Sequence, residues 1–120
     1  MERTNIIINV VDRNYGSKAS PDAIVVHKYN RLTIGSRVCT SLGVAPDDFI
    51  IVGEFNGSWY ISKKPQGQFA GYRLRVPYKT ATFLEVSSKA LKGMPMGSYH
   101  LGAKIVDGND IEWFPIVKEN

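Results

Sequence analysis

Cysteine and histidine are the side chains of this sequence that could act as a nucleophile, a base or a metal ligand, and they are few. The chain has one cysteine, Cys39, and two histidines, His27 and His100. A cysteine nucleophile needs a basic partner that holds it as thiolate, and no spacing in the sequence ties either histidine to Cys39. A zinc site needs paired cysteine or histidine ligands, which the sequence lacks. We therefore predict a small buried thiol at Cys39, no catalytic residue, no metal site and no cofactor.

Carboxylates form two groups in the sequence, Asp47-Asp48 and the run from Asp107 to Asp110. Both groups stand among turn residues, where Asp and Asn are favoured because their side chains bond the local backbone. The twelve-residue pattern of a calcium loop is absent, and so are the glycine-rich fingerprints of nucleotide-binding loops. The sequence thus predicts a protein that is not an enzyme, and it indicates no small-molecule substrate.

The positive charge of the chain is concentrated in one stretch. Fifteen lysines and arginines against eleven acidic residues give a formal net charge of +4. The segment 72–92 holds five of the basic residues and a single acidic one, Glu85, so it accounts for the whole excess. In its first part Arg73 and Arg75 alternate with apolar residues, which predicts a strand with one cationic and one buried face. Such a face is typical of phosphate binding and also of a solvated strand edge protected against aggregation.

Strand-forming residues dominate the sequence, in short runs bounded by Gly, Pro, Asn or Asp. The clearest helix is 36–42, where Val38 and Leu42 lie one turn apart and Gly43 is placed to cap the end. A shorter helical turn is predicted at 87–92. The predicted strands are 4–11, 23–27, 31–34, 48–55, 58–62, 73–76, 83–86, 98–106 and 111–117.

Two predicted hairpins carry most of the large aromatic side chains. Their turns are Asn56-Gly57 and Asp107-Gly108, which lie between apolar runs and supply the positive φ angles of tight hairpins. Trp59-Tyr60 lies on the first hairpin and Trp113-Phe114 on the second. Because side chains alternate across a strand, at least one ring of each pair must face away from the main core. This indicates a second buried apolar face, formed between the two halves of the chain, in a dimer, or within a small barrel or sandwich.

Two segments of the chain share the order strand, short helix, turn and hairpin. In the first, a helix capped by Gly43 leads to a hairpin that starts at Phe49, and in the second Gly93 leads to Tyr99 in the same way. The separation between capping glycine and first aromatic is six residues in both. We therefore predict one β-rich domain over residues 1–120, with an internal pseudo-repeat of residues 29–65 and 84–118.

An ordered set of motifs runs through the first of these segments without a gap. It consists of Arg31-Leu32-Thr33-Ile34, Leu42-Gly43-Val44, Asp48, the apolar run Ile50 to Phe55, and Gly57. This order resembles the swapped-hairpin module of the AbrB, SpoVT and MraZ transcription factors, which has a strand ending Arg-x-h-Ile-Pro, a helix ending Leu-Gly-h, a turn ending in Asp and an apolar hairpin turning at Gly. A second, degenerate copy would make the chain similar to MraZ, which carries two such modules. The resemblance implies a swapped-hairpin barrel that binds DNA.

Four positions depart from that family pattern. Gly35 stands where the family has a proline after the strand, and Asp47 stands where a glycine precedes the turn Asp. Cys39 and Thr40 occupy the helix positions at which AbrB-like proteins place arginines that contact DNA. The resemblance therefore implies the fold and phosphate contacts rather than readout of bases.

The compartment follows from cysteine use and from the length of the apolar runs. A single cysteine forms no internal disulfide, which indicates a reducing compartment. The sequence has no apolar run of the length that spans a bilayer, about 18 residues or more, and its first residues lack a signal-peptide pattern. We expect a soluble, cytoplasmic protein that does not act on membranes.

Together these features predict a mainly β fold: a small single domain of strand, short helix and hairpin units, swapped-hairpin or barrel-like, with one or two short helices. The predicted function is nucleic-acid binding, as an AbrB-like transcriptional regulator that contacts DNA mainly through phosphates. The alternative is a non-enzymatic structural or assembly module that pairs through its apolar hairpins, and a homo-oligomer fits either function. The candidate nucleic-acid-binding residues are Arg31, Arg37, Arg73, Arg75, Lys79, Lys89 and Lys92.

Overall fold

Antiparallel strands, one short α-helix and two 3-10 turns form the regular structure of the protein, a computed structural model that describes residues 20–67 and 69–119. The fold is mainly β, as predicted, and the predicted strand 4–11 lies outside the described residues. The helical elements are η1 (Lys28–Asn30), α1 (Ser36–Leu42) and η2 (Lys89–Leu91). The strands are β1 (Ile24–His27), β2 (Arg31–Ile34), β3 (Phe49–Phe55), β4 (Ser58–Lys63), β5 (Tyr72–Arg73), β6 (Leu84–Ser87), β7 (Gly97–Leu101), β8 (Ile105–Val106) and β9 (Glu112–Lys118).

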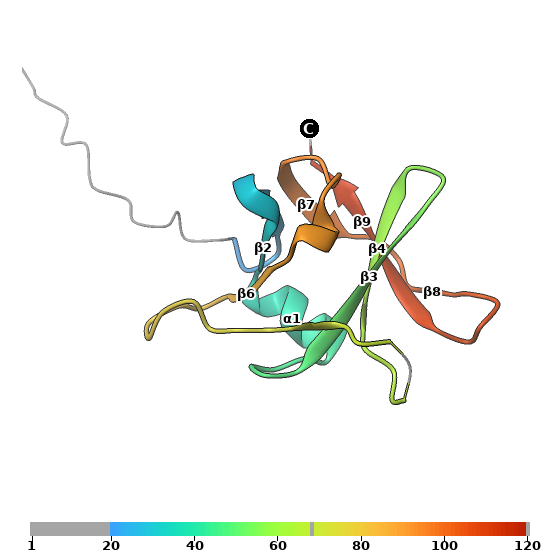
Figure 1. The fold of residues 1–120 in the computed structure, drawn as a ribbon, viewed down its shortest axis with the longest axis horizontal. Coiled ribbons are helices and arrows are strands. Elements are labelled where there is room, and N and C mark those ends of the chain that lie inside the picture. Colours follow the sequence, from blue (N-terminus) through green and yellow to red (C-terminus); the bar gives the residue numbers. More distant parts are fainter. Residues whose placement is uncertain (1–19, 68, 120) are drawn as a thin grey trace, which may run out of the picture.

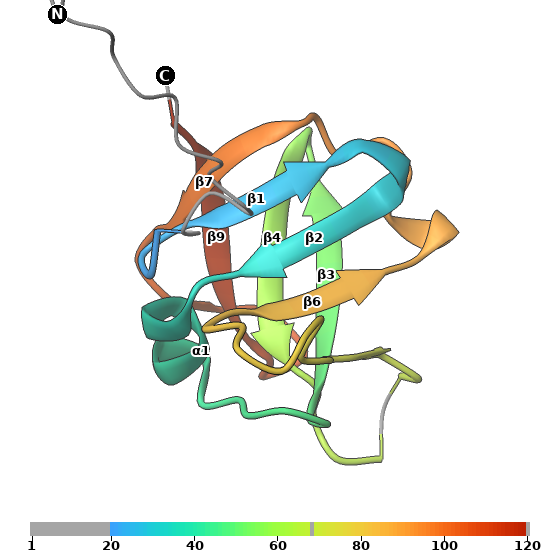
Figure 2. The ribbon, with the colours of Figure 1, turned by 90° about the vertical axis from the view of Figure 1, so that its left-hand side faces the viewer.

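The strands form one sheet that curves into a nearly closed barrel (Figures 1 and 2). Their order is β5-β3-β4-β9-β7-β1-β2-β6, and β8 pairs with β9 outside this path. The two ends of the order meet at Arg75 and Glu85, whose backbone groups exchange hydrogen bonds of 3.0 and 2.8 Å. We call this junction the seam of the barrel. At the seam β6 lies between β2 and the segment after β5.

The pairing scheme is the same when the two halves of the chain are exchanged. The first half supplies β1 to β4, and the second supplies β5, β6, β7 and β9. β2 pairs with its counterpart β6, and β4 pairs with its counterpart β9. β1 pairs with β7 of the other half, as β5 pairs with β3. This interlocked arrangement is consistent with the predicted pseudo-repeat, while a duplication of one ancestral unit stays a prediction.

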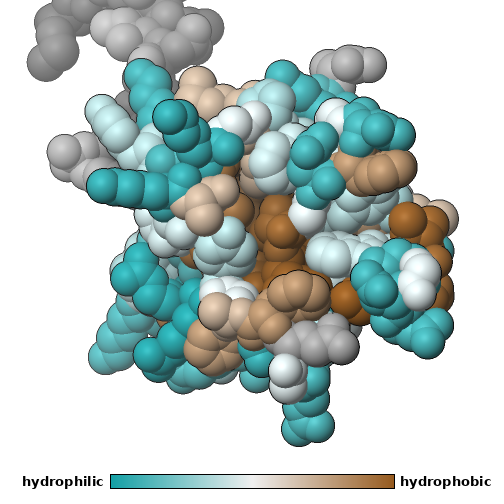
Figure 3. Space-filling model, turned by 45° about the vertical axis from the view of Figure 1, so that its right-hand side comes forward, coloured by the Kyte–Doolittle hydropathy of each residue, from teal (hydrophilic) through white to brown (hydrophobic). Residues whose placement is uncertain are grey.

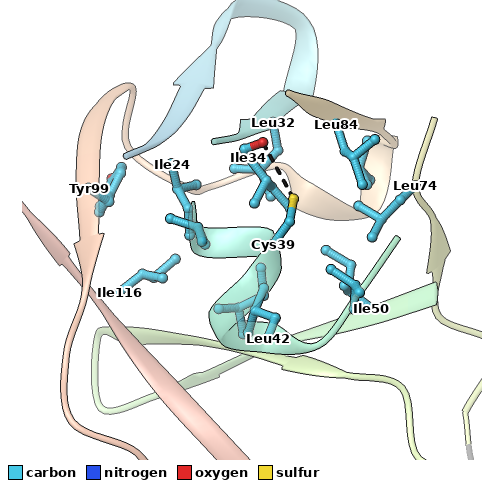
Figure 4. Packing of buried hydrophobic residues seen from close by; sticks show 14 of the residues in the cluster. Ile24, Leu32, Ile34, Cys39, Leu42, Ile50, Leu74, Leu84, Tyr99 and Ile116 are labelled. Atoms are coloured by element: carbon cyan, nitrogen blue, oxygen red, sulfur yellow. Dashed lines mark hydrogen bonds between the residues drawn. The ribbon is translucent and has the colours of Figure 1, made fainter. Parts of the chain in front are cut away.

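Alternating side chains of the strands fill the inside of the barrel, and α1 contributes the rest of the core (Figure 4). Cys39 and Leu42 point from α1 toward the strands, and the Cys39 Sγ donates to the Ile34 carbonyl at 3.7 Å. The predicted buried thiol is therefore confirmed, and burial raises its pKa. The largest fully buried side chains are Ile24, Leu32, Ile34, Ile50, Ile61 and Leu74.

The helix α1 has the bounds that the sequence predicts, but its first turn is capped in an unpredicted way. Gly43 ends the helix in the left-handed conformation, with φ 72°. At the other end Gly35 offers no side-chain cap. The Pro21 carbonyl accepts from the backbone N–H of Arg37 at 2.9 Å and of Val38 at 3.3 Å, so the segment before β1 satisfies the helix start.

Three predicted elements are shorter than expected. The strand 73–76 is reduced to β5 and the single bridge residue Arg75. The strand 98–106 is interrupted at Gly102, which bonds through its N–H to the Pro115 carbonyl at 2.7 Å, so β7 and β8 are separate. The helical turn 87–92 is the 3-10 turn η2.

Both predicted hairpin turns are present, with one difference in backbone conformation. Asn56 and Gly57 have φ angles of 53° and 81°, as the tight turn between β3 and β4 requires. In the β8–β9 turn the positive φ falls on Asp110, at 60°, and not on Gly108. That detail of the prediction is wrong because the turn is longer, with Asp107 and Ile111 bonded across it at 3.0 Å.

Candidate nucleic-acid interface

Two of the predicted arginines are joined by one carboxylate on the outside of the barrel. Arg31 Nη1 donates to Glu85 Oε2 at 3.4 Å, and Arg75 Nη2 donates to Glu85 Oε1 at 3.2 Å. The Glu85 side chain is nearly buried between them, whereas the arginine side chains remain 47% and 61% exposed. Each guanidinium carries five N–H donors and uses one of them on Glu85, so both groups are oriented and still have free donors.

Strand alternation explains why Glu85 faces outward. Its neighbours Leu84 and Val86 are buried in the core, so Glu85 lies on the opposite face of β6. Glu85 is opposite Thr33 of β2, and the seam places Arg75 beside it on the other side. Although it lies on the outer face, Glu85 is only 8% exposed, and its two carboxylate oxygens contact Arg31 and Arg75.

His27 extends this polar cluster to β1. Its Nε2 lies 3.0 Å from Thr33 Oγ1, within hydrogen-bond distance. Burial, and then the positive charge of Arg31, lower the pKa of His27 below 6.5, while the charge of Glu85 acts in the opposite direction. At neutral pH the cluster therefore keeps a neutral imidazole beside two cations and one anion.

The turn between β1 and β2 projects an aromatic ring next to this cluster. Tyr29 is 90% exposed and has a φ angle of 63°, an uncommon conformation for a residue other than glycine. Together with Lys28, Arg31 and Ser87 it lines a shallow depression of about 510 Å³. A free ring beside cationic side chains is an arrangement on which a nucleic-acid base can stack.

The second 3-10 turn adds Lys89 to the same end of the barrel. η1 and η2 contact one another, and the Ser88 N–H donates to the Asn30 carbonyl at 3.2 Å. Lys89 is exposed on η2. We define the basic surface as Lys28, Arg31, Arg75 and Lys89, of which Arg31 and Arg75 contact the carboxylate of Glu85.

Of the four other predicted residues, two pair with carboxylates and two are exposed. Arg37 on α1, beyond the far end of β2, pairs with Asp22 at 3.0 Å. Arg73 pairs with Asp47 at 2.6 Å, and the Asp47 backbone has a φ angle of 74°, an uncommon conformation for a residue other than glycine. Lys79 and Lys92 are exposed, in the loop before β6 and directly after η2.

Sequence reasoning missed Lys28, Tyr29 and the orienting role of Glu85. The signal for the first two was present, because a three-residue segment ending in Asn between two strands indicates a turn, and turn tips are exposed. Two other tyrosines, Tyr72 and Tyr78, flank the predicted cationic strand but contact other parts of the protein. Tyr72 packs against the core, and Tyr78 packs edge to face on Phe83 with ring centres 5.8 Å apart.

The lowered pKa of His27 predicts a pH dependence of stability. As the pH falls below 6.5, the unfolded chain takes up a proton at His27 before the folded protein does, so stability decreases until the pH passes the folded pKa. Urea denaturation followed between about pH 5 and 7 should show this loss, and His27→Gln should reduce the slope. Parallel profiles for the two proteins would contradict the prediction.

The described residues thus form a nearly closed, barrel-like sheet that carries the four exposed cations of the basic surface on its outside. No family model, curated protein or solved structure matches this chain. In the part of the chain that the structure describes, no helix is long and apolar enough to cross a membrane.

Proposed function

We propose that the protein binds nucleic acid through phosphate contacts at the basic surface. The observation that carries the proposal is the pair of exposed guanidinium groups of Arg31 and Arg75, both held by Glu85. Holding them in advance reduces the side-chain entropy lost on binding. Arginine also binds phosphate oxygens in a two-pronged geometry that a lysine does not provide.

The remaining groups of the surface support the same function. Lys28 and Lys89 add two exposed cations, and Tyr29 offers a ring for stacking. The finer assignment as an AbrB-like transcriptional regulator rests on the sequence resemblance over residues 29–65. Phosphate contacts carry little sequence information. Cys39 is buried where that family would contact DNA from the helix, so we expect weak sequence preference.

The salt dependence of DNA binding tests the proposal. If all four residues of the basic surface contact phosphate, the logarithm of the affinity for duplex DNA should fall with the logarithm of salt concentration with a slope of about −3.6. Fluorescence anisotropy with labelled duplex and single-stranded DNA measures this slope. Lys28→Glu with Lys89→Glu removes two of the four contacts, so it should weaken binding and make the slope shallower by about 1.8.

Lys63→Glu with Lys104→Glu is the matched control, since it reverses two exposed lysines on β4 and before β8. This control should leave most of the affinity intact. Equal loss in both double variants, or no binding of either DNA at low salt, would overturn the proposal.

A second candidate is an assembly module that pairs through its apolar hairpins. It is supported by Phe55, 67% exposed at the end of β3, and by Val106, exposed on β8. Sedimentation velocity on the same variants separates the two functions. Assembly through the hairpins would give concentration-dependent oligomers that persist in Lys28→Glu with Lys89→Glu, without salt-sensitive DNA binding.

A further inference from the structure

A second site lies on the outer face of β3 and β4, where the β8–β9 hairpin crosses it. It is a pocket of about 370 Å³, at the lower end of the range for small-molecule sites. Three aromatic side chains line it: Phe55, Tyr60 and Trp113. Figure 3 views the molecule from the side of this hairpin and shows exposed apolar residues among polar ones on this side of the molecule.

The aromatic walls are the outward members of the two predicted aromatic pairs. Trp59 and Phe114 pack against the main core, whereas Tyr60 and Trp113 line the pocket. The expectation that one ring of each pair faces away from the core is therefore confirmed. In the described part of the chain the side chains of Tyr60 and Trp113 are only half-buried, so they are available to a ligand.

The Trp113 ring is fixed at both of its ends. A Cβ atom on Gly53 would lie 3.2 Å from the Trp113 ring, so the ring packs closely on β3 at this glycine and would have to shift slightly for any larger residue. At the other end the Trp113 Nε1–H donates to Asp107 Oδ2 at 3.0 Å. The pocket wall is therefore already in place before any ligand arrives.

The charge around the pocket is negative, in contrast to the basic surface. Glu54 and Asp107 line it, and none of the described residues that line it is basic. Hydrogen bonds from Trp113 and from the backbone of Ile111 and Asn109 lower the pKa of Asp107, so this carboxylate stays ionised at neutral pH. Glu54 Oε1 is positioned by the Gly57 N–H at 2.8 Å.

We propose that this pocket binds a methylated ammonium group. Aromatic faces attract a cation through the ring quadrupole, and methyl groups give that cation an apolar surface that fits an aromatic enclosure. The two carboxylates add a long-range attraction and disfavour anions. The ligand chemistry is thus a quaternary or alkylated amine, either on a free small molecule or on a methylated lysine side chain.

Choline and a neutral compound of the same shape, 3,3-dimethylbutan-1-ol, test the proposal. Calorimetric titration of the full chain should show binding of choline, and the uncharged alcohol should bind several-fold more weakly. In NMR spectra choline should shift the indole N–H signal of Trp113, which Trp113→Phe assigns. Equal affinity for the alcohol would overturn the proposal, because the pocket would then recognise apolar volume alone.

Substitutions of exposed or half-buried pocket residues should leave the fold intact, so that a loss of binding reports on the pocket itself. Phe55→Leu, Tyr60→Leu and Glu54→Gln keep size or hydrogen bonding and should each weaken choline binding by about 2- to 30-fold. Tyr29→Leu removes an exposed tyrosine that lies beside the basic surface; it is the matched control and should leave choline affinity unchanged. Choline affinity that is insensitive to the three pocket variants would overturn the proposal.

The two sources of the group are compared directly. A short peptide carrying trimethyllysine and the same peptide with unmodified lysine are titrated beside choline. Preference for the trimethylated peptide or for choline supports the site and identifies the source. Absence of binding by both methylated ligands up to tens of millimolar would overturn the proposal.

Discussion

Replacing Gly35 with alanine is expected to destabilise the protein by about 3 kcal/mol. A Cβ atom at this position would lie 2.6 Å from the Pro21 carbonyl oxygen and 2.7 Å from its carbon, and it would also overlap the Ser20 oxygen. These are backbone atoms, so no side-chain rotation relieves the overlap. Moving them would also disturb the Pro21 carbonyl that caps α1. Equilibrium urea unfolding measures the loss.

Gly108→Ala is the matched control for this substitution. A Cβ atom on Gly108 would have no neighbouring atom within 4 Å, and the Gly108 backbone is not left-handed, so its replacement should change stability by less than about 0.5 kcal/mol. Equal effects of the two substitutions would contradict the packing argument. A proline at position 35 would, in addition to the overlap, lose the bond from the Gly35 N–H to the Ala23 carbonyl at 2.9 Å.

Leu74→Ala is expected to cost about 2 to 5 kcal/mol, the range for a large core side chain that leaves a cavity. Leu74 is 0% exposed and lies next to the seam. The Leu74 N–H donates to the Asp48 carbonyl at 2.8 Å, and the Leu74 carbonyl accepts from the Asp47 N–H at 2.9 Å. These bonds hold the backbone on both sides, so it should not collapse into the cavity that the substitution leaves. Thermal and urea unfolding measure the change.

Val76→Ala tests whether the loss of stability in Leu74→Ala is caused by the burial of the side chain. Val76 is two residues further along the same segment but is exposed, so its truncation should have a small effect. A loss as large as that of Leu74→Ala would contradict the argument, since it would show that any apolar residue near the seam matters equally.

The elements that depend only on residues close together in the sequence were predictable from the sequence. The helix 36–42 was predictable because Val38 and Leu42 share a face and Gly43 provides a left-handed end. The strand 31–34 and the Asn56-Gly57 turn follow from alternation and turn chemistry in the same way. The broken strand 98–106 was not predictable, because the interruption at Gly102 depends on Pro115, a residue of another strand.

The candidate site was only partly predictable for a related reason. Alternation correctly placed Arg73 and Arg75 outward around buried Leu74. The carboxylates that hold these arginines come from other elements: Asp47, before β3, for Arg73, and Glu85 of β6 for Arg75. Arg73 has a carboxylate of its own, whereas Arg75 shares Glu85 with Arg31. This difference depends on the order of strands in the sheet, which no short stretch of sequence determines.

The place of β9 in the barrel also affects how the chain is completed during synthesis. β9 is the last strand along the described residues, yet it lies between β4 and β7 and pairs with both. Until Glu112–Lys118 has left the ribosome, β4 and β7 each present an unpaired edge, and the two halves of the sheet meet only at the seam. A nascent chain that pauses before this strand therefore exposes two unpaired strand edges at once. Such edges promote aggregation unless β9 is synthesised quickly or chaperones cover them.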